Sequence, residues 1–76
     1  MYEELTQIFR DVFADPSLEI NRSTTAAQVR GWDSITHLKL IVTIEEVLGI
    51  SFTGFEIMRM QNVGDMLDLI EQKRRS

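Results

Sequence analysis

Hydrophobic positions near the start of the chain recur at the spacing of one helix face. They fall at i, i+3, i+4, i+7 and i+8, which are the positions of Leu5, Ile8, Phe9, Val12 and Phe13. The pair Asp15-Pro16 then interrupts the pattern, because a proline inside a helix lacks the N–H that the helix needs. The pattern therefore predicts an amphipathic helix that ends before Pro16.

The next stretch, residues 16–33, keeps no hydrophobic period for long. Its apolar residues are scattered among polar ones, so we expect a long connection that these apolar side chains hold across the protein. A short helical turn is expected around Thr25 to Val29. Connections of this length are uncommon in compact domains and are often functional.

A second helix is predicted from about Ser34 to Leu48. It has many more apolar positions than one narrow stripe, which is typical of a helix at the centre of a core. Gly49 follows directly and supplies the C-terminal stop, because glycine readily adopts the left-handed conformation in which helices end.

Two further helices are expected in the last third of the chain. The stretch from Thr53 to Glu56, Thr-Gly-Phe-Glu, has the form of a capping box and predicts a short third helix from Phe55 to Met60. Asn62 is placed to cap a fourth helix, whose basic residues at 73–75 complement the negative end of its dipole. The predicted fold class is all-α. It is a small four-helix bundle of three longer helices and a short third helix, with a long loop between the first two, in one domain over residues 1–76.

Length and charge restrict the function. A chain of 76 residues buries only about 60% of the surface that its unfolded form exposes, which leaves no room for a deep enzyme cleft. We therefore expect a binding or carrier role rather than catalysis. The net charge of −4 argues against a nucleic-acid partner, because such binding depends on lysine and arginine neutralising phosphates.

The distribution of residue types also indicates where the protein works. The chain has no cysteine, and it has no apolar run long enough to predict a membrane span. Residues 1–4 are acidic where a secretory signal is basic and then apolar. We expect a cytoplasmic protein that is a monomer.

The candidate chemistry centres on Ser34, which follows Gly31-Trp32-Asp33 at the predicted start of the second helix. The first N–H groups of a helix lack partners within the helix, and the helix dipole makes this end positive. A phosphate esterified to this serine would gain about 0.3–1 kcal/mol from that field. The sequence therefore marks Ser34 as a good position for an anionic group.

The run from Gly31 to Ile50 carries a motif. It begins Gly-Trp-Asp-Ser-Ile, continues as an apolar helix and ends Glu-Glu-Val-Leu-Gly-Ile. This pattern resembles the second-helix signature of acyl carrier proteins, in which Asp-Ser-Leu precedes a helix with Glu-Glu and a hydrophobic residue. Ile35 in place of leucine is a mild departure. The resemblance covers nearly the whole chain, because the order of helices and the length are those of a free-standing member.

The resemblance implies that Ser34 carries 4′-phosphopantetheine, which a separate Mg²⁺-dependent phosphopantetheinyl transferase takes from coenzyme A. It also implies that Asp33 helps the transferase to hold its metal and to dock, and locally Asp33 is placed to cap the helix. A chain without cysteine must import the thiol that forms thioesters, which agrees with this assignment. The expected function is that of an acyl carrier protein, a substrate and partner of enzymes.

Three alternatives stay open. An aminoacyl or peptidyl carrier protein would use the same cofactor, and a helical protein-interaction module would use none. A small hydrolase built on Ser34 and His37 is disfavoured, because no third group orients the histidine and no oxyanion hole is evident. We expect His37 to face solvent. One histidine and no cysteine also leave no metal site made of nitrogen and sulfur ligands.

Partner docking is expected on the second helix, at Ile35, Thr36, Lys39, Glu45 and Glu46. By the same resemblance, carriers of primary fatty acid synthesis usually have acidic residues early in this helix, where this chain has Thr36 and Lys39. The departure predicts a specialised carrier in a polyketide, fatty-acid or modified-lipid pathway. Its expected partners are an acyl-loading enzyme and enzymes of the ketosynthase or acyltransferase type.

The cargo is expected to enter a core that parts between the second helix and the later segments. The residues predicted to line this acyl pocket are Leu40, Ile41, Ile44, Phe52, Ile57, Met60, Val63 and Leu67. Met58, Met60 and Met66 are predicted to be core residues. Trp32 is predicted to anchor the long loop against the bundle and so to hold Ser34 in place.

Overall fold

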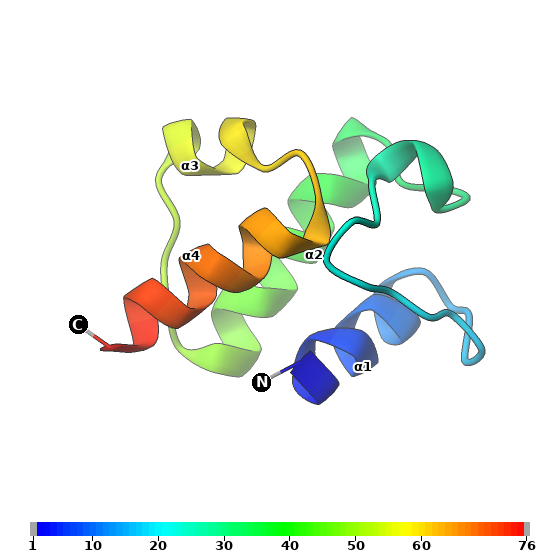
Figure 1. Cartoon of the computed structure of the whole chain (residues 1–76), viewed down its shortest axis with the longest axis horizontal. Coiled ribbons are helices and arrows are strands. Elements are labelled where there is room, and N and C mark those ends of the chain that lie inside the picture. The colour runs from blue at the N-terminus through cyan, green and yellow to red at the C-terminus, as the bar shows by residue number, and fades with distance from the viewer. Residues whose placement is uncertain (1, 76) are drawn as a thin grey trace.

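A computed structural model describes residues 2–75, which form four α-helices and one short 3₁₀ helix (Figure 1). In chain order these are α1 (Tyr2–Val12), η1 (Ala26–Gln28), α2 (Ser34–Leu48), α3 (Gly54–Arg59) and α4 (Val63–Arg75). No strand occurs between residues 2 and 75. The predicted all-α bundle, with its short third helix and long first loop, is confirmed.

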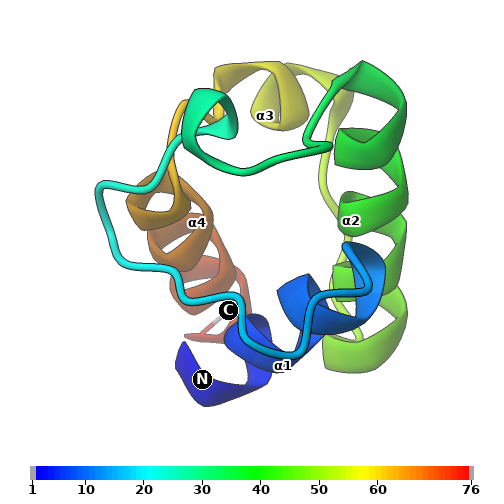
Figure 2. The same ribbon diagram turned by 90° about the vertical axis from the view of Figure 1, so that its right-hand side faces the viewer.

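The helices surround one hydrophobic core. Figure 2 shows α2 and α4 on opposite sides, with α1 across one end and α3 across the end at which α2 begins. The buried cluster consists of Leu5, Ile8, Phe9, Ile20, Leu40, Ile41, Ile44, Val63, Met66, Leu67 and Ile70. None of the residues of α3 is fully buried. This helix meets the core through the half-buried side chain of Ile57.

The helix ends follow the capping residues. Gly49 ends α2 in the left-handed conformation, with φ of 67°. At α3, Glu56 N–H donates to Thr53 Oγ1 over 3.1 Å and Thr53 N–H donates to Glu56 Oε1 over 2.8 Å, so the predicted capping box is confirmed. Because Thr53 is the cap, α3 begins and ends one residue earlier than predicted. Asn62 caps α4 by accepting from Asp65 N–H over 2.8 Å.

The long loop is tied to the start of α4 by backbone hydrogen bonds. Gly64 N–H donates to Arg22 O over 2.8 Å, and Val63 N–H donates to Thr24 O over 2.9 Å. These two bonds satisfy donors that have no partner within the helix. The Tyr2 hydroxyl donates to the carbonyl of Ile20, whose side chain is buried. The loop is therefore a fixed part of the fold, with η1 at the expected turn.

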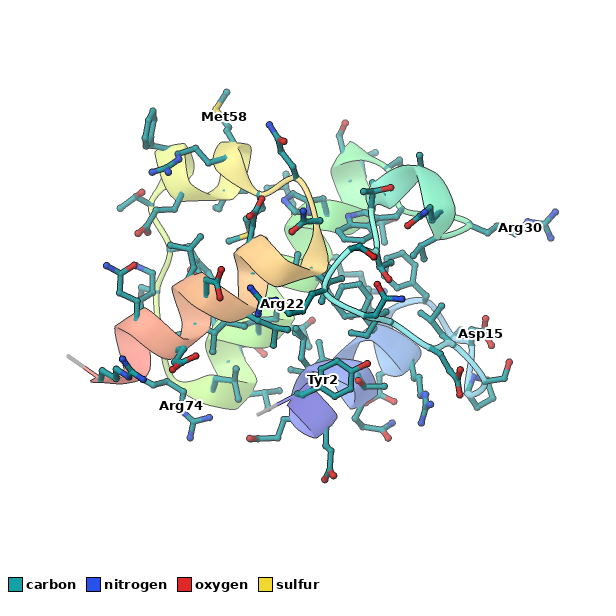
Figure 3. All side chains as sticks on the ribbon, viewed as in Figure 1. Tyr2, Asp15, Arg22, Arg30, Met58 and Arg74 are labelled. Carbon is teal, nitrogen blue, oxygen red and sulfur yellow. The ribbon has the colours of Figure 1, made fainter. Side chains whose placement is uncertain are left out.

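One expectation about hydrophobic residues is wrong, and α2 shows a feature that was not predicted. Met58 is 86% exposed rather than a core residue, and its side chain points away from the body of the molecule (Figure 3). α2 buries only one of its apolar faces, while Ile35, Leu38 and Val42 on the other face are half exposed or more. The excess of apolar positions in α2 therefore reflects a second, exposed hydrophobic face. None of the helices within residues 2–75 has the length and apolar character that crossing a membrane requires.

Candidate functional site

Ser34 is the first residue of α2, and Asp33 before it caps the helix. Asp33 Oδ1 accepts a hydrogen bond from Thr36 N–H over 2.8 Å, which confirms the local capping role that was predicted. This bond from Thr36 holds the pKa of Asp33 below its usual value, because it stabilises the charged carboxylate. The cap thus fixes the point at which the chain enters α2.

The Ser34 side chain is available for chemistry. Ser34 is exposed, and its hydroxyl makes no hydrogen bond to any of residues 2–75. It stands in the first turn of a 15-residue helix, where the dipole favours a negative group. An exposed hydroxyl in this field suits a phosphoester.

Trp32 anchors the loop just before this serine, as predicted. Its ring packs edge-on against Phe9 at 5.3 Å between centroids and contacts Phe13 at 6.0 Å. Phe9 lies within α1, and Phe13 directly follows its last residue. The aromatic cluster therefore fixes the position of Ser34 relative to α1.

His37 does not face solvent, so that expectation is wrong. Its Nδ1 accepts a hydrogen bond from Trp32 Nε1–H over 3.1 Å, because an indole N–H can only donate. The ring proton then lies on Nε2, which donates to Ile57 O in α3 over 3.3 Å. We call these three residues the Trp32–His37–Ile57 latch. With both ring nitrogens engaged, His37 has none left to take a proton from Ser34, which argues against a hydrolase.

A cleft of about 570 Å³ opens beside Ser34. Its walls come from η1, from the start of α2 and from α3, and they include Ala26, Ser34, His37, Leu38, Ile57 and Met58. Leu38 and Met58, both largely exposed, extend this apolar surface outward. No set of three histidine, aspartate or glutamate side chains that could hold a metal ion is found in the part of the chain that the structure describes.

The residues predicted to dock partners lie along α2 but differ in exposure. Ile35, Lys39 and Glu46 are exposed, and Thr36 is half-buried. Glu45 is also half-buried, and its Oε2 accepts a hydrogen bond from Phe52 N–H over 2.9 Å. Glu45 thus holds the segment after α2 in addition to any role at the surface.

The residues predicted to line an acyl pocket separate into two groups. Leu40, Ile41, Ile44, Val63 and Leu67 are buried in the core, while Phe52, Ile57 and Met60 pack against it from outside. Of these eight, Ile57 and Met60 also line the cleft beside Ser34.

Sequence reasoning missed the latch and the exposed side chains of Leu38, Phe55 and Met58. The signal for the exposed surface was the i, i+3 spacing of Phe55 and Met58 in a helix too short to bury much. The latch had no such signal, because it joins residues 20 positions apart.

The family model described as "Phosphopantetheine attachment site" matches residues 3–70 of this chain. The chain belongs to the acyl carrier protein family. Its cofactor is accordingly 4′-phosphopantetheine, and members of this family act as carriers rather than as enzymes.

Two similar proteins agree with this membership. The carrier is 25% identical over 71 residues to an acyl carrier protein of Coprothermobacter proteolyticus, an alignment that covers 93% of this chain and 87% of that one. A solution NMR structure of a holo acyl carrier protein from Geobacter metallireducens matches with a TM-score of 0.92 and 40% identity. That match covers 97% of this chain and 85% of the other.

Proposed function

We propose that Ser34 carries the 4′-phosphopantetheine arm of this carrier and presents acyl groups on it as thioesters. The observation that carries this proposal is an exposed, unbonded serine hydroxyl at the N-terminus of α2, in a chain that matches a phosphopantetheine family. The surroundings fit the group, since the helix field favours its phosphate and the adjoining cleft is mostly apolar.

Attachment requires one displacement at phosphorus. Ser34 Oγ forms a bond to the phosphorus of coenzyme A that bears the pantetheine, and the pyrophosphate bond breaks to release adenosine 3′,5′-bisphosphate. The hydroxyl proton goes to a base of the transferase, because His37 has no free ring nitrogen. When bound, the arm supplies the thiol that this cysteine-free chain lacks.

The surface around Ser34 is the proposed docking face for partner enzymes. Residues 34–44 contain no carboxylate, and Lys39 is the one lysine or arginine among them. Ile35, Thr36 and Lys39 would meet the partner near the arm, with Glu45 and Glu46 toward the far end of α2. We infer that Asp33 assists the transferase in holding its metal, besides capping α2.

The proposed cargo is an acyl group of a polyketide, fatty-acid or modified-lipid pathway. Most of the cleft surface is apolar, and its lining includes one carboxylate, that of Asp33. The apolar part favours an acyl over an aminoacyl group, because a charged ammonium gains nothing from hydrophobic surroundings. The proposed partners are a phosphopantetheinyl transferase, an acyl-loading enzyme and a ketosynthase or acyltransferase. The carrier would act as a cytoplasmic monomer.

Intact mass spectrometry tests the attachment site. With coenzyme A and a phosphopantetheinyl transferase, the wild-type chain should gain one phosphopantetheine group. Ser34→Ala should gain none and should keep its helical circular dichroism, because the exposed hydroxyl makes no contact that the fold needs and Asp33 still caps α2.

The matched control is Ser51→Ala, which removes another exposed serine hydroxyl outside the helices. This variant should be modified as fully as the wild type. Modification that persists in Ser34→Ala would show that the arm is attached elsewhere.

A further inference from the structure

Met58 differs from the other methionines that the structure describes in its access to solvent. Its side chain is 86% exposed and points away from the body of the molecule (Figure 3). Met60 is half-buried against the core, and Met66 is fully buried. Because an oxidant must reach the thioether sulfur to react with it, Met58 is the methionine of residues 2–75 that is most open to oxidation.

The sulfur chemistry available to the apo chain is that of methionine, since the chain has no cysteine. When Met58 Sδ attacks one oxygen of hydrogen peroxide, the O–O bond breaks. That oxygen stays on the sulfur as a sulfoxide, and the other leaves with both hydrogens as water. The sulfur loses two electrons and the peroxide gains them. The side chain thereby changes from apolar to polar.

The position of Met58 gives this change a consequence for the candidate site. Met58 and Ser34 line the same cleft, together with the apolar side chain of Leu38. An enzyme whose active site takes up the Ser34 hydroxyl lies against these walls and removes water from them. Covering a sulfoxide that finds no hydrogen-bond partner costs free energy that covering a thioether does not.

The fold itself should not depend on the oxidation state of Met58. α3 meets the core through Ile57, and its first turn is held by the capping box between Thr53 and Glu56. Neither of these contacts involves the Met58 side chain. Oxidation therefore changes the surface beside Ser34 and leaves the contacts of the core in place.

We propose that Met58 is a site of reversible oxidation by hydrogen peroxide, and that its sulfoxide lowers the rate at which partner enzymes act on Ser34. The inference rests on the proposed attachment at Ser34. Methionine sulfoxide reductases reverse such a modification. The carrier is thus modified more slowly under oxidising conditions and recovers when the sulfoxide is reduced.

Peptide mapping of the peroxide-treated apo carrier tests the site. With limiting hydrogen peroxide, which catalase then removes, Met58 should gain one oxygen atom before Met60 does. Met66 should gain none, and the helical circular dichroism should not change. Met1 lies outside the described residues and is followed in a separate peptide.

Transferase kinetics test the consequence of oxidation. The treated apo carrier is mixed with coenzyme A and a phosphopantetheinyl transferase, and intact mass follows the gain of the arm. The kcat/KM should fall by about fivefold or more, which corresponds to the low end of the cost of covering an unpaired polar group. Incubation of the oxidised carrier with methionine sulfoxide reductases should restore the rate.

Two substitutions at position 58 separate this sulfur from other targets of peroxide. Each variant is compared with its own untreated form. Met58→Leu is apolar without sulfur and should lose no rate on treatment, whereas the matched control Met60→Leu should lose as much as the wild type. Met58→Gln places a polar amide at the same position and, without peroxide, should react about fivefold more slowly than Met58→Leu.

The outcomes that would overturn the proposal are distinct. Oxidation of Met60 or Met66 before Met58 would contradict the site. An oxidised wild type that reacts as fast as the untreated one would contradict the consequence, as would equal rates for Met58→Gln and Met58→Leu. A Met58→Leu variant that loses rate like the wild type would place the sensitive group elsewhere. Failure of the attachment itself is a different result, because the untreated wild type would then gain no mass.

Discussion

α2 has one hydrophobic side that is buried in the core and another that is exposed. The buried side serves stability, and the exposed side adjoins the proposed functional site. On its inner side, Leu40, Ile41 and Ile44 are buried against α1 and α4. On its outer side, Ile35, Leu38 and Val42 remain at least half exposed, and the exposed Met58 of α3 lines the same cleft as Leu38. The same residue types therefore serve a closed core on one side and an open face beside Ser34 on the other.

The difference teaches that hydrophobic content alone does not identify core residues. Apolar side chains gathered on the surface of a small protein usually mark a site of interaction. Here two of them, Leu38 and Met58, line the same cleft as Ser34, the proposed attachment point, whereas the inner side of α2 contains no chemically reactive group. Removing side chains from the two sides should consequently have different effects on stability.

The largest expected effect comes from truncating one side chain on each side of α2. Ile44→Ala should lower the free energy of unfolding by about 2–5 kcal/mol, because it leaves a cavity among fully buried side chains. Val42→Ala, on the exposed face of the same helix, should change it by less than about 0.5 kcal/mol. Urea unfolding followed by circular dichroism measures both. Equal losses would contradict the division of α2 into a core side and an open side.

A smaller loss of stability is expected from Gly64→Ala, at the point where the long loop is hydrogen-bonded to α4. Replacing a glycine inside a helix by alanine usually raises the free energy of unfolding by about 0.5–1 kcal/mol. At Gly64, however, the new Cβ would lie 2.9 Å from Arg22 O, so the loop backbone must shift and we expect a loss of about 1–2 kcal/mol.

Gly54→Ala is the control for this variant, since nothing lies within 4 Å of the position of its Cβ. It should leave the stability unchanged or slightly higher. A Gly64→Ala variant that is more stable than the wild type would show that the loop backbone can shift at little cost. The contact between the loop and α4 would then be less rigid than its hydrogen bonds indicate.

The smallest expected effect concerns docking on the open face. Lys39→Glu should raise the rate of reaction with a ketosynthase whose carrier-facing surface is basic, by about fivefold at low salt, because one charge pair at contact distance in water is worth about 1 kcal/mol. The gain should shrink as the ionic strength rises. Initial rates at two salt concentrations measure it.

Arg75→Glu is the matched control, because it makes the same change in net charge near the end of α4, away from the start of α2 (Figure 1). It should leave the rate nearly unchanged. Equal effects of the two variants would mean that net charge matters and that Lys39 lies outside the contact.

Local signals in the sequence were enough to predict most of the fold. The apolar spacing from Leu5 to Phe13, the glycine after Leu48 and the caps at Thr53 and Asn62 each depend on residues a few positions apart. Such short-range physics fixes helix ends to within a residue, as the one-residue shift of α3 illustrates. The motif around Ser34 is also local, which is why the candidate site could be named in advance.

The features that were not predicted depend on contacts between distant parts of the chain. His37 was expected in solvent because a polar residue near a helix start usually is exposed, but Trp32 and Ile57 both reach its ring. Met58 was expected in the core because of its hydrophobicity, yet a helix of six residues cannot bury both of its sides. Only the three-dimensional arrangement decides such cases.

The pairing of the long loop with α4 has a consequence for how the molecule folds. The carbonyls of Arg22 and Thr24 are the partners of the first free amides of a helix that begins some 40 residues later. Loop closure over such a distance costs entropy before any contact repays it. The first turn of α4 should therefore form late, together with the loop. During synthesis on the ribosome, the loop cannot reach its final conformation until the start of α4 has emerged.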